Sequence, residues 1–295
     1  MSDYIRRMAH VAIEVPDLDA SVAWATTVMG LTETERVGGV SYLTHADCHH
    51  SLQYIAGNRD EAALHHVAMQ AHDGPALDAL RARLVQLGVP ILSTEPEELA
   101  LDRALRFRGP AGHVIEVFVG MQSTGTARTG AGVPPRKFGH PMLACEDTRT
   151  TVAFLIDVLG FRLSDDVGDG TLVFMRCNPD HHGIGVGRGP RAGLNHYAWG
   201  VENIGAIGHL GDVLARNGGR FIWGPGRHGA GQNIFSYHFD PAGCIVEYYA
   251  DLYQVWDERT YEPGRWSLDD PRFANLWGPA PPQEMMETAT PLAAQ

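Results

Sequence analysis

The sequence predicts an α+β protein of two similar domains, each built from two βαβββ units whose strands form a curved mixed sheet around a central cavity. Three pairs of matching segments carry this prediction, because each segment recurs further along the chain at a nearly constant offset. Such a regular offset indicates internal duplication. The anchor residues of the pairs are His10 and His140, His66 and His196, and Glu116 and Glu247.

Each half is expected to contain two units in which a strand precedes a helix and short alternating strands follow it. Helices are predicted at about 19–29, 76–86, 148–158 and 204–216. The second and the fourth end before Gly88 and Gly218, where a glycine can close the helix in the left-handed conformation. Four such units give a mixed α+β chain.

Changes in composition along the chain predict four segments. Residues 1–121 form the first domain, 122–136 a linker rich in Gly, Thr and Pro, 137–251 the second domain and 252–295 an aromatic-rich C-terminal tail. The tail contains Trp256, Trp266 and Trp277, so it is expected to pack across the second domain or a neighbouring subunit. The end, from about residue 281, is expected to be poorly ordered.

The net charge and the polar N-terminal residues argue against several functional classes. The 295 residues carry a formal charge of −12, which argues against nucleic acid and anionic membranes as partners. The polar start has no apolar run typical of a signal peptide or a membrane helix. A cytoplasmic protein that acts on small molecules is therefore expected.

The second half contains a set of metal-ligand residue types. His140, His196 and Glu247 each lie in an apolar stretch that is expected to form a strand. Two imidazoles and one carboxylate leave adjacent coordination positions free, which suits a non-heme Fe(II) ion that holds substrate and dioxygen together. The sequence thus predicts a metal centre in the second domain.

Hairpin register favours the second half over the first for this centre. Asp240-Pro-Ala-Gly-Cys244 has the composition of a three-residue hairpin loop, which sets Tyr237 directly across from Glu247. Cβ atoms in such pairs are ~4.5–5.5 Å apart. The same register in the first half sets Arg106 across from Glu116, where a salt bridge would occupy the carboxylate. We therefore expect the first domain to lack the active metal site, and leave open whether its His10, His66 and Glu116 bind any metal.

The order of these residues resembles a known family. His140, His182, His196, His228, Tyr237 and Glu247 occur in the order and strand contexts of the type I extradiol ring-cleaving dioxygenases, in the vicinal-oxygen-chelate superfamily, and the resemblance covers about residues 8–252. It implies a catechol dioxygenase of aromatic hydrocarbon catabolism that cleaves a substituted catechol with O2 at Fe(II), or Mn(II), to a muconic semialdehyde. A homo-oligomer is also implied.

The resemblance also implies roles for individual residues. His140, His196 and Glu247 would bind the metal, His182 would act as acid and base, and His228 and Tyr237 would donate hydrogen bonds to oxygen and substrate. The chain departs from many relatives at Asn195, where they have histidine, and at Ala230 and Gly231, where they have polar residues. These departures concern the substrate more than the chemistry.

The sequence alone does not identify the substrate. Candidate substrate contacts are Phe174, Trp223, Asn233 and Arg272. Phe174 and Trp223 would line an apolar pocket for alkyl or aryl catechols, whereas Arg272 in the tail would meet an acidic substituent from a lid.

Two other functions are compatible with the same plan. One is a different metalloenzyme of the superfamily, either a hydroquinone-cleaving dioxygenase or a glyoxalase-like lyase. The other is a non-enzymatic ligand-binding module of the same fold. Glyoxalase-like sites commonly draw their ligands from two paired domains, and a binding module needs no metal, so metal analysis and catechol-dependent oxygen uptake separate these alternatives.

Overall fold

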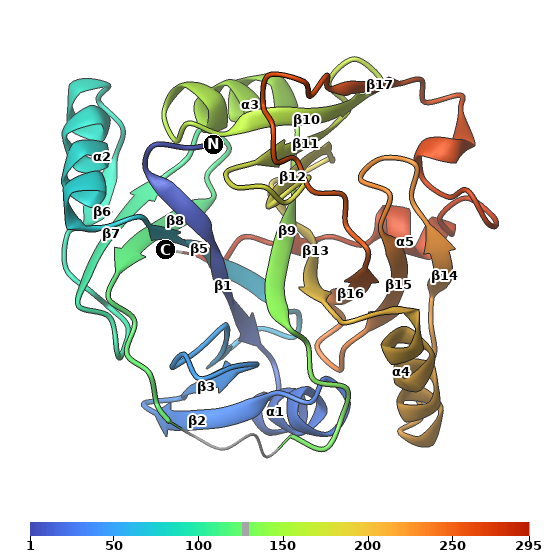
Figure 1. Ribbon diagram of the computed structural model, residues 1–295. Coiled ribbons are helices and arrows are strands. Elements are labelled where there is room, and N and C mark those ends of the chain that lie inside the picture. The colour runs from blue at the N-terminus through green and yellow to red at the C-terminus, as the bar shows by residue number, and fades with distance from the viewer. Residues whose placement is uncertain (126–129, 295) are drawn as a thin grey trace.

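The computed structural model describes residues 1–125 and 130–294 and contains two β-sheets, one for each half of the chain (Figure 1). Residues 126–129 of the predicted linker and the last residue of the tail lie outside the described residues. The predicted fold is confirmed, because each half contains two βαβββ units in succession.

The first half forms an eight-stranded sheet in the order β2-β3-β4-β1-β5-β8-β7-β6. β1 and β5 pair antiparallel at its centre, and each pairs in parallel with the last strand of its own unit. The elements are β1 (Ile5–Val15), α1 (Leu18–Thr27), β2 (Thr32–Val37), β3 (Val40–Thr44), β4 (Leu52–Ala56), β5 (Ala63–Ala71), α2 (Gly74–Gln86), β6 (Ile91–Ser93), β7 (Arg103–Arg108) and β8 (Val114–Val119).

The second half repeats this plan in a ten-stranded sheet, ordered β14-β15-β16-β13-β9-β12-β11-β10-β17, with β18 on β13. The repeated elements are β9 (Lys137–Cys145), α3 (Thr148–Asp157), β10 (Arg162–Val167), β11 (Leu172–Arg176), β12 (Ile184–Arg188), β13 (Gly193–Gly200), α4 (Ile204–Arg216), β14 (Trp223–Arg227), β15 (Ile234–Phe239) and β16 (Ile245–Ala250). The tail adds β17 (Gly264–Trp266), a 3-10 turn (Pro271–Phe273), α5 (Gln283–Glu287) and β18 (Thr290–Pro291).

Equivalent helices of the two halves start in the same way. The Asp17 carboxylate accepts a hydrogen bond from the Ala20 amide at 2.9 Å, and the Asp147 carboxylate accepts one from the Thr150 amide at 3.0 Å. Each aspartate satisfies an amide that the first helical turn leaves unpaired. The helices lie on the outer sides of the sheets (Figure 1). Among the described residues, none of the helices is both long and apolar enough to span a bilayer.

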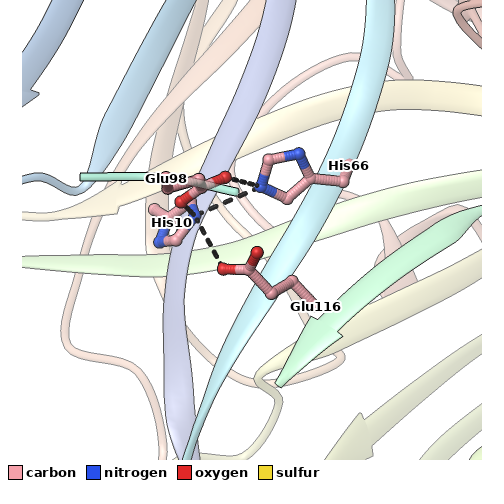
Figure 2. Close-up of side chains that lie close together, drawn as sticks. All are labelled: His10, His66, Glu98 and Glu116. Atoms are coloured by element: carbon pink, nitrogen blue, oxygen red, sulfur yellow. Dashed lines mark hydrogen bonds and ion pairs between the residues drawn. The ribbon is translucent and has the colours of Figure 1, made fainter. Parts of the chain in front are cut away.

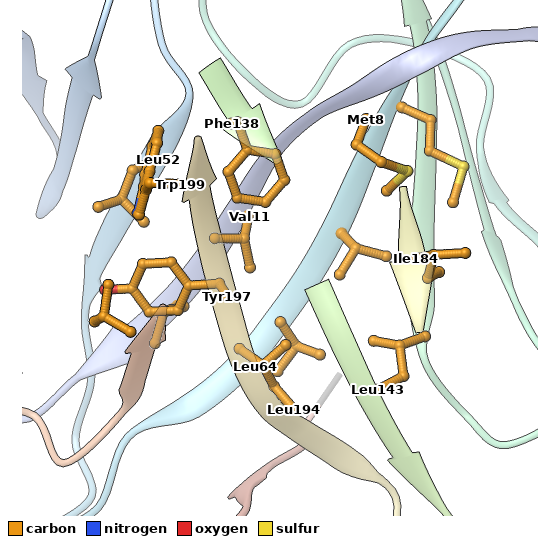
Figure 3. Packing of buried hydrophobic residues seen from close by; sticks show 14 of the residues in the cluster. Met8, Val11, Leu52, Leu64, Phe138, Leu143, Ile184, Leu194, Tyr197 and Trp199 are labelled. Atoms are coloured by element: carbon orange, nitrogen blue, oxygen red, sulfur yellow. The ribbon is translucent and has the colours of Figure 1, made fainter. Parts of the chain in front are cut away.

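A single core joins the two halves. Leu64 of β5 and Leu194, Tyr197 and Trp199 of β13 belong to one cluster of buried apolar side chains, as Figure 3 shows. Burying a leucine-sized side chain contributes about 1.5–3 kcal/mol, so this shared packing fixes the two sheets against each other. The Tyr54 and Tyr197 hydroxyls, 3.1 Å apart, add a buried polar link.

The expectation of a poorly ordered C-terminus is wrong for residues 281–294. β18 pairs antiparallel with β13, and the Ala293 amide donates to the Leu64 carbonyl at 2.9 Å. At Gly193 an added Cβ would lie 2.2 Å from the Thr290 carbonyl oxygen, so glycine allows the close approach. Backbone pairing holds the end of the tail against β13 and β5, and this pairing could not be predicted from the composition of the tail.

One buried histidine makes the stability of the fold dependent on pH. His238 of β15 is fully buried near Trp24 and Tyr248, and within the described residues neither ring nitrogen has a hydrogen-bond partner. Burial lowers its pKa from 6.5 to about 3. Below pH 6.5 the unfolded chain therefore binds the proton before the folded one does, and stability present above that pH is lost progressively towards pH 3.

Replacing His238 with Leu should reduce this loss. At pH 5 the wild type should have lost about 2 kcal/mol through this histidine, at about 1.4 kcal/mol per pH unit, and the variant should not. The measurement is urea unfolding of both proteins at pH 7.5 and pH 5, with the exposed His209 replaced by Leu as control. Equal pH dependence in all three proteins would contradict the prediction.

Candidate active site

Strand order and register bring the three predicted metal ligands together. His140 lies on β9, His196 on β13 and Glu247 on β16, and β13 pairs with both of the other strands. Ala198 of β13 is opposite His140 on one side and Glu247 on the other. His196 is two residues from Ala198, and side chains two residues apart point to the same face of a strand. Three neighbouring strands therefore direct their donors to one point.

The donor atoms have the spacing of a shared metal ion. The Glu247 Oε2 atom lies 3.1 Å from Nε2 of His140 and 3.2 Å from Nε2 of His196, and the two imidazole nitrogens are 3.4 Å apart. Donors at right angles around an ion, with bonds of about 2.1 Å, are about 3 Å apart. All three residues are buried. The donor set and its spacing therefore fit an octahedral Fe(II) or Mn(II) ion with open positions.

Two asparagines orient these donors. The Asn195 Oδ1 atom accepts from His196 Nδ1 at 2.8 Å, which leaves the Nε2 lone pair directed inward. The Asn233 amide donates to Glu247 Oε1 at 3.1 Å. Asn233 was predicted as a substrate contact, and its fully buried amide bonds the Glu247 carboxylate because it directly precedes β15 beside β16.

The charge of Glu247 is stabilised inside this site. Burial alone would raise its pKa, but the imidazoles of His140 and His196 hold that pKa well below 4.5. Burial lowers the pKa of His196. Metal binding requires an ionised carboxylate and imidazole nitrogens without a proton, and the lowered pKa values of Glu247 and His196 favour that state.

Tyr237 and His228 form a pair beside the ligand carboxylate. The predicted pairing of Tyr237 with Glu247 across the hairpin is confirmed. The Tyr237 hydroxyl lies 3.1 Å from His228 Nε2, and His228 Nδ1 donates to the Ala274 carbonyl at 2.5 Å. Nε2 of His228 therefore accepts the Tyr237 proton in this arrangement. Burial lowers the pKa of His228 to about 4.

His182 lies on the other side of the ligands, just before β12. Its ring is 4.3 Å from the ring of His140 and 4.9 Å from the ring of Phe174, which was predicted to line the pocket. Its Nδ1 atom lies 3.0 Å from Nδ1 of His181, a partner that sequence reasoning did not assign. Burial lowers the pKa of His182 well below 6.5, so the imidazole is neutral at neutral pH.

The glycine-rich loop after β14 packs against these histidines. Gly231 has φ +77°, and an added Cβ would lie 3.1 Å from His181 Nδ1 and 3.2 Å from His182 Cε1. A side chain at this position would displace the predicted acid–base residue. The departure from the family at Gly231 therefore brings the loop backbone close to His182.

The remaining predicted substrate contacts lie on either side of the site. The Trp223 indole stacks on Tyr237 at 5.4 Å, and its Nε1 donates to the Pro279 carbonyl of the tail at 3.0 Å. The Arg272 side chain is 72% exposed and pairs with Asp270 at 2.7 Å. In this conformation Arg272 is bonded to its own turn and does not extend towards the metal ligands.

A cavity of about 350 Å³ adjoins His181 and Gly231. The tail forms much of its wall, because β17 pairs with β10 and Trp266 Nε1 donates to Asp165 Oδ2 at 3.0 Å. Among the described residues that line the cavity there is no lysine or arginine. They are Asp165, His181, Gly229, Gly231, Gln232, Tyr253, Thr260, Tyr261, Glu262, Gly264 and Trp266.

The equivalent position in the first domain has different chemistry. Arg106 faces Glu116 as predicted, with Nε 2.8 Å from Oε2. Sequence reasoning missed Glu98, whose carboxylate lies 3.0 Å from His10 Nε2 and 2.6 Å from His66 Nε2. Burial and the Glu98 carboxylate raise the pKa of Glu116 to about 8, although Arg106 opposes the rise. The ionised form of Glu116 is thus disfavoured beside the Glu98 carboxylate, even with Arg106 present.

Comparison with known proteins identifies the family. The model of the glyoxalase/bleomycin resistance protein/dioxygenase superfamily matches residues 7–117 and again residues 137–248. The chain belongs to this superfamily. The two matches correspond to the two halves of the duplication, and the predicted vicinal-oxygen-chelate family and fold are confirmed.

Individual relatives of this superfamily member are metal-dependent enzymes. The chain is 27% identical to a manganese-dependent 2,3-dihydroxybiphenyl 1,2-dioxygenase of Geobacillus genomosp. 3, over 94% of this chain and 95% of the relative. It is 26% identical to an iron-dependent extradiol dioxygenase of Rhodococcus jostii, over 93% and 96%. The structure of a Mn(II)-bound glyoxalase from Novosphingobium aromaticivorans is 30% identical, with a TM-score of 0.85 over 96% of this chain and 94% of that one.

Proposed function

We propose that this protein is an extradiol dioxygenase that cleaves a substituted catechol with O2 at a metal ion held by His140, His196 and Glu247. The observation that carries the proposal is the convergence of these three donors with His182, His228 and Tyr237 around one buried point. The relatives named as extradiol dioxygenases support the same chemistry. The metal is Fe(II), with Mn(II) as the alternative.

When bound, the metal supplies Lewis-acid and redox chemistry to a catechol and to dioxygen on its open positions. The residues of the chain do the rest. The neutral His182 imidazole accepts a catechol proton and returns it later to a departing oxygen. During the reaction the Tyr237 hydroxyl turns from His228 Nε2 and donates its one hydrogen bond to developing oxygen charge. Tyr237 is buried and His228 is largely buried, which limits access of water and strengthens these bonds.

We propose an uncharged, aryl-substituted catechol as the substrate class. The cavity beside His181 is lined by the aromatic rings of Tyr253, Tyr261 and Trp266 and by the carboxyl-bearing Asp165 and Glu262. A carboxylate substituent would meet no cation among the described residues that line the cavity and would be repelled by acidic side chains. The Geobacillus relative, which by its name acts on 2,3-dihydroxybiphenyl, supports the aryl class.

A glyoxalase-type reaction is the second candidate, because the relative with 30% identity is named as a glyoxalase. Such a reaction needs a metal and a base next to the metal-bound substrate. A glyoxalase-type reaction does not require the hydrogen-bonded pair of His228 and Tyr237 that the site contains. This pair favours the dioxygenase, in which charge develops on oxygen.

The deciding experiment measures oxygen uptake by the Fe(II)-loaded protein with a panel of catechols. We expect stoichiometric oxygen consumption and a yellow ring-opened product, with kcat/KM higher for 2,3-dihydroxybiphenyl than for 3,4-dihydroxyphenylacetate. Absence of catechol-dependent uptake, together with turnover of a glutathione hemithioacetal, would replace the proposal by the second candidate. A preference for the acidic catechol would refute the proposed substrate class alone.

The proposed assembly is a cytoplasmic homo-oligomer whose partners are a small catechol and O2. Its support is exposed apolar surface on the tail, where Trp256 is 75% exposed and Trp277 is 53% exposed. Exposed aromatic residues in one segment are typical of contact surfaces between subunits.

A further inference from the structure

We propose that the first domain binds a second divalent metal ion through His10, His66, Glu98 and Glu116, in a closed site that has a structural role. The inference concerns residues outside the catalytic centre and does not depend on the proposed function. The four side chains point toward one another from β1, β5, the segment between β6 and β7, and β8 (Figure 2).

The geometry of this cluster suits a four-coordinate ion. One donor atom from each residue lies within 4.8 Å of all the others, and all four residues are buried. The imidazole nitrogens Nε2 of His10 and His66 are 3.3 Å apart. Donors around a tetrahedral ion with bonds of about 2.0–2.1 Å are about 3.3 Å apart. Two imidazoles and two carboxylates form a donor set for Zn(II) or Mn(II).

The internal duplication shows why this site is closed. His228 follows Glu98 at the same offset that separates His66 from His196, and His182 follows His50 at nearly that offset. In the second domain these positions hold residues around open coordination positions. In the first domain Glu98 instead directs its carboxylate at His10 and His66, and His50 Nε2 lies 3.1 Å from Glu98 Oε2. A fourth protein donor thus occupies the space that a substrate would need.

The charges of the cluster leave room for a divalent cation. Arg106 contacts Glu97, Glu98 and Glu116 at 2.6, 2.6 and 2.8 Å, so three carboxylates share one guanidinium. When all three are ionised, their net charge with Arg106 is −2, which a divalent ion neutralises. Glu98 and Glu116 are buried, where uncompensated charge is costly.

An unpaired oxygen atom of Glu116 is a separate observation that points to an ion in this cluster. Glu116 is fully buried, and its Oε1 atom has no hydrogen-bond partner within the described part of the chain. This oxygen points into the cluster, 3.9 Å from His10 Nε2. In the second domain the corresponding Oε1 of Glu247 accepts from Asn233. Leaving a buried carboxylate oxygen unpaired is costly, and a cation among these donors removes that cost.

Metal titration distinguishes the two centres in the intact protein. Chelator-treated protein is dialysed against Zn(II) and bound zinc is measured by mass spectrometry. We expect two equivalents per chain in the wild type, one in Glu247→Ala and one in Glu98→Ala. The matched control is Glu97→Gln, which removes a half-exposed Arg106 partner that is not a ligand and should keep two equivalents. One equivalent in the wild type, or none in Glu247→Ala, would overturn the proposal in favour of a metal-free network held by Arg106.

A second measurement does not depend on whether Glu98→Ala folds. In Glu247→Ala the catalytic centre is disabled, so a rise of Tm on adding Zn(II) reports the first-domain site alone, because a ligand that binds only the folded state stabilises it. We expect a rise of several degrees that Glu97→Gln in the same background retains. An unchanged Tm would contradict the second site, and catechol cleavage by the wild type is tested separately from both results.

Discussion

Glu247→Ala should release the metal from the second domain and reduce catechol cleavage to background. Glu247 supplies the only carboxylate among the three donors, and its Oε2 atom lies within 3.2 Å of both imidazole nitrogens. Its ionised form balances part of the charge of the metal in a buried site. Loss of residues that merely support a ligand weakens metal binding by about 10–100-fold, and loss of a ligand should exceed this.

The measurement combines iron content with oxygen uptake. Glu202→Ala, which removes an exposed carboxylate paired with Arg136, is the control and should keep iron and turnover. Because Glu247 is buried, circular dichroism must show that the variant is folded. A folded Glu247→Ala protein that still turned over catechol with iron bound in the second domain would refute the ligand set.

The parts of the site that hairpin register determines were predictable from the sequence. The loop Asp240-Pro-Ala-Gly-Cys244 closes with a hydrogen bond from the Asp240 amide to the Cys244 carbonyl, and Gly243 has φ +80°. A glycine in this conformation fixes the loop length, and the loop length fixes which residues face each other. The length of this loop, which the sequence predicts, therefore places Tyr237 opposite Glu247.

The parts that were missed depend on contacts between segments far apart in the chain. Glu98 lies in an irregular segment between β6 and β7, 48 residues from its partner His50, and no periodic pattern directs its side chain inward. The one available signal was its place in the duplication, since Glu98 precedes His228 at the offset that relates His10 to His140. The tail strand at Thr290 was missed because it is held by backbone pairing with Leu194, and backbone pairing does not require a particular side-chain composition.

The duplication explains why one frame supports two kinds of centre. Both halves place two histidines on central strands and a glutamate on the strand beside them. The difference lies in the residue across the hairpin: the neutral Tyr237 faces the Glu247 carboxylate, whereas the charged Arg106 bonds one oxygen of the Glu116 carboxylate. The residue at this register position thus sets how many oxygens of the carboxylate stay available to a metal.

His182→Phe should lower kcat by about 10²–10⁴-fold while iron stays bound, which is the usual contribution of a positioned acid or base. The His182 ring lies 4.3 Å from the ring of His140, so its side chain borders the proposed metal site. Burial lowers its pKa, and the neutral imidazole takes the catechol proton. Phenylalanine keeps the ring packing against Phe174 but cannot accept or return a proton.

The iron content of His182→Phe separates a chemical role from a structural one. Retained iron with a lower kcat means that the metal site is intact and the proton transfer is lost, whereas lost iron means that the ring supports His140. His209→Phe, a change at an exposed histidine of α4, should leave both quantities unchanged. Near-native turnover by His182→Phe at neutral pH would transfer the acid–base role to another group, and His228, which accepts a hydrogen bond from the Tyr237 hydroxyl, is the next residue to replace.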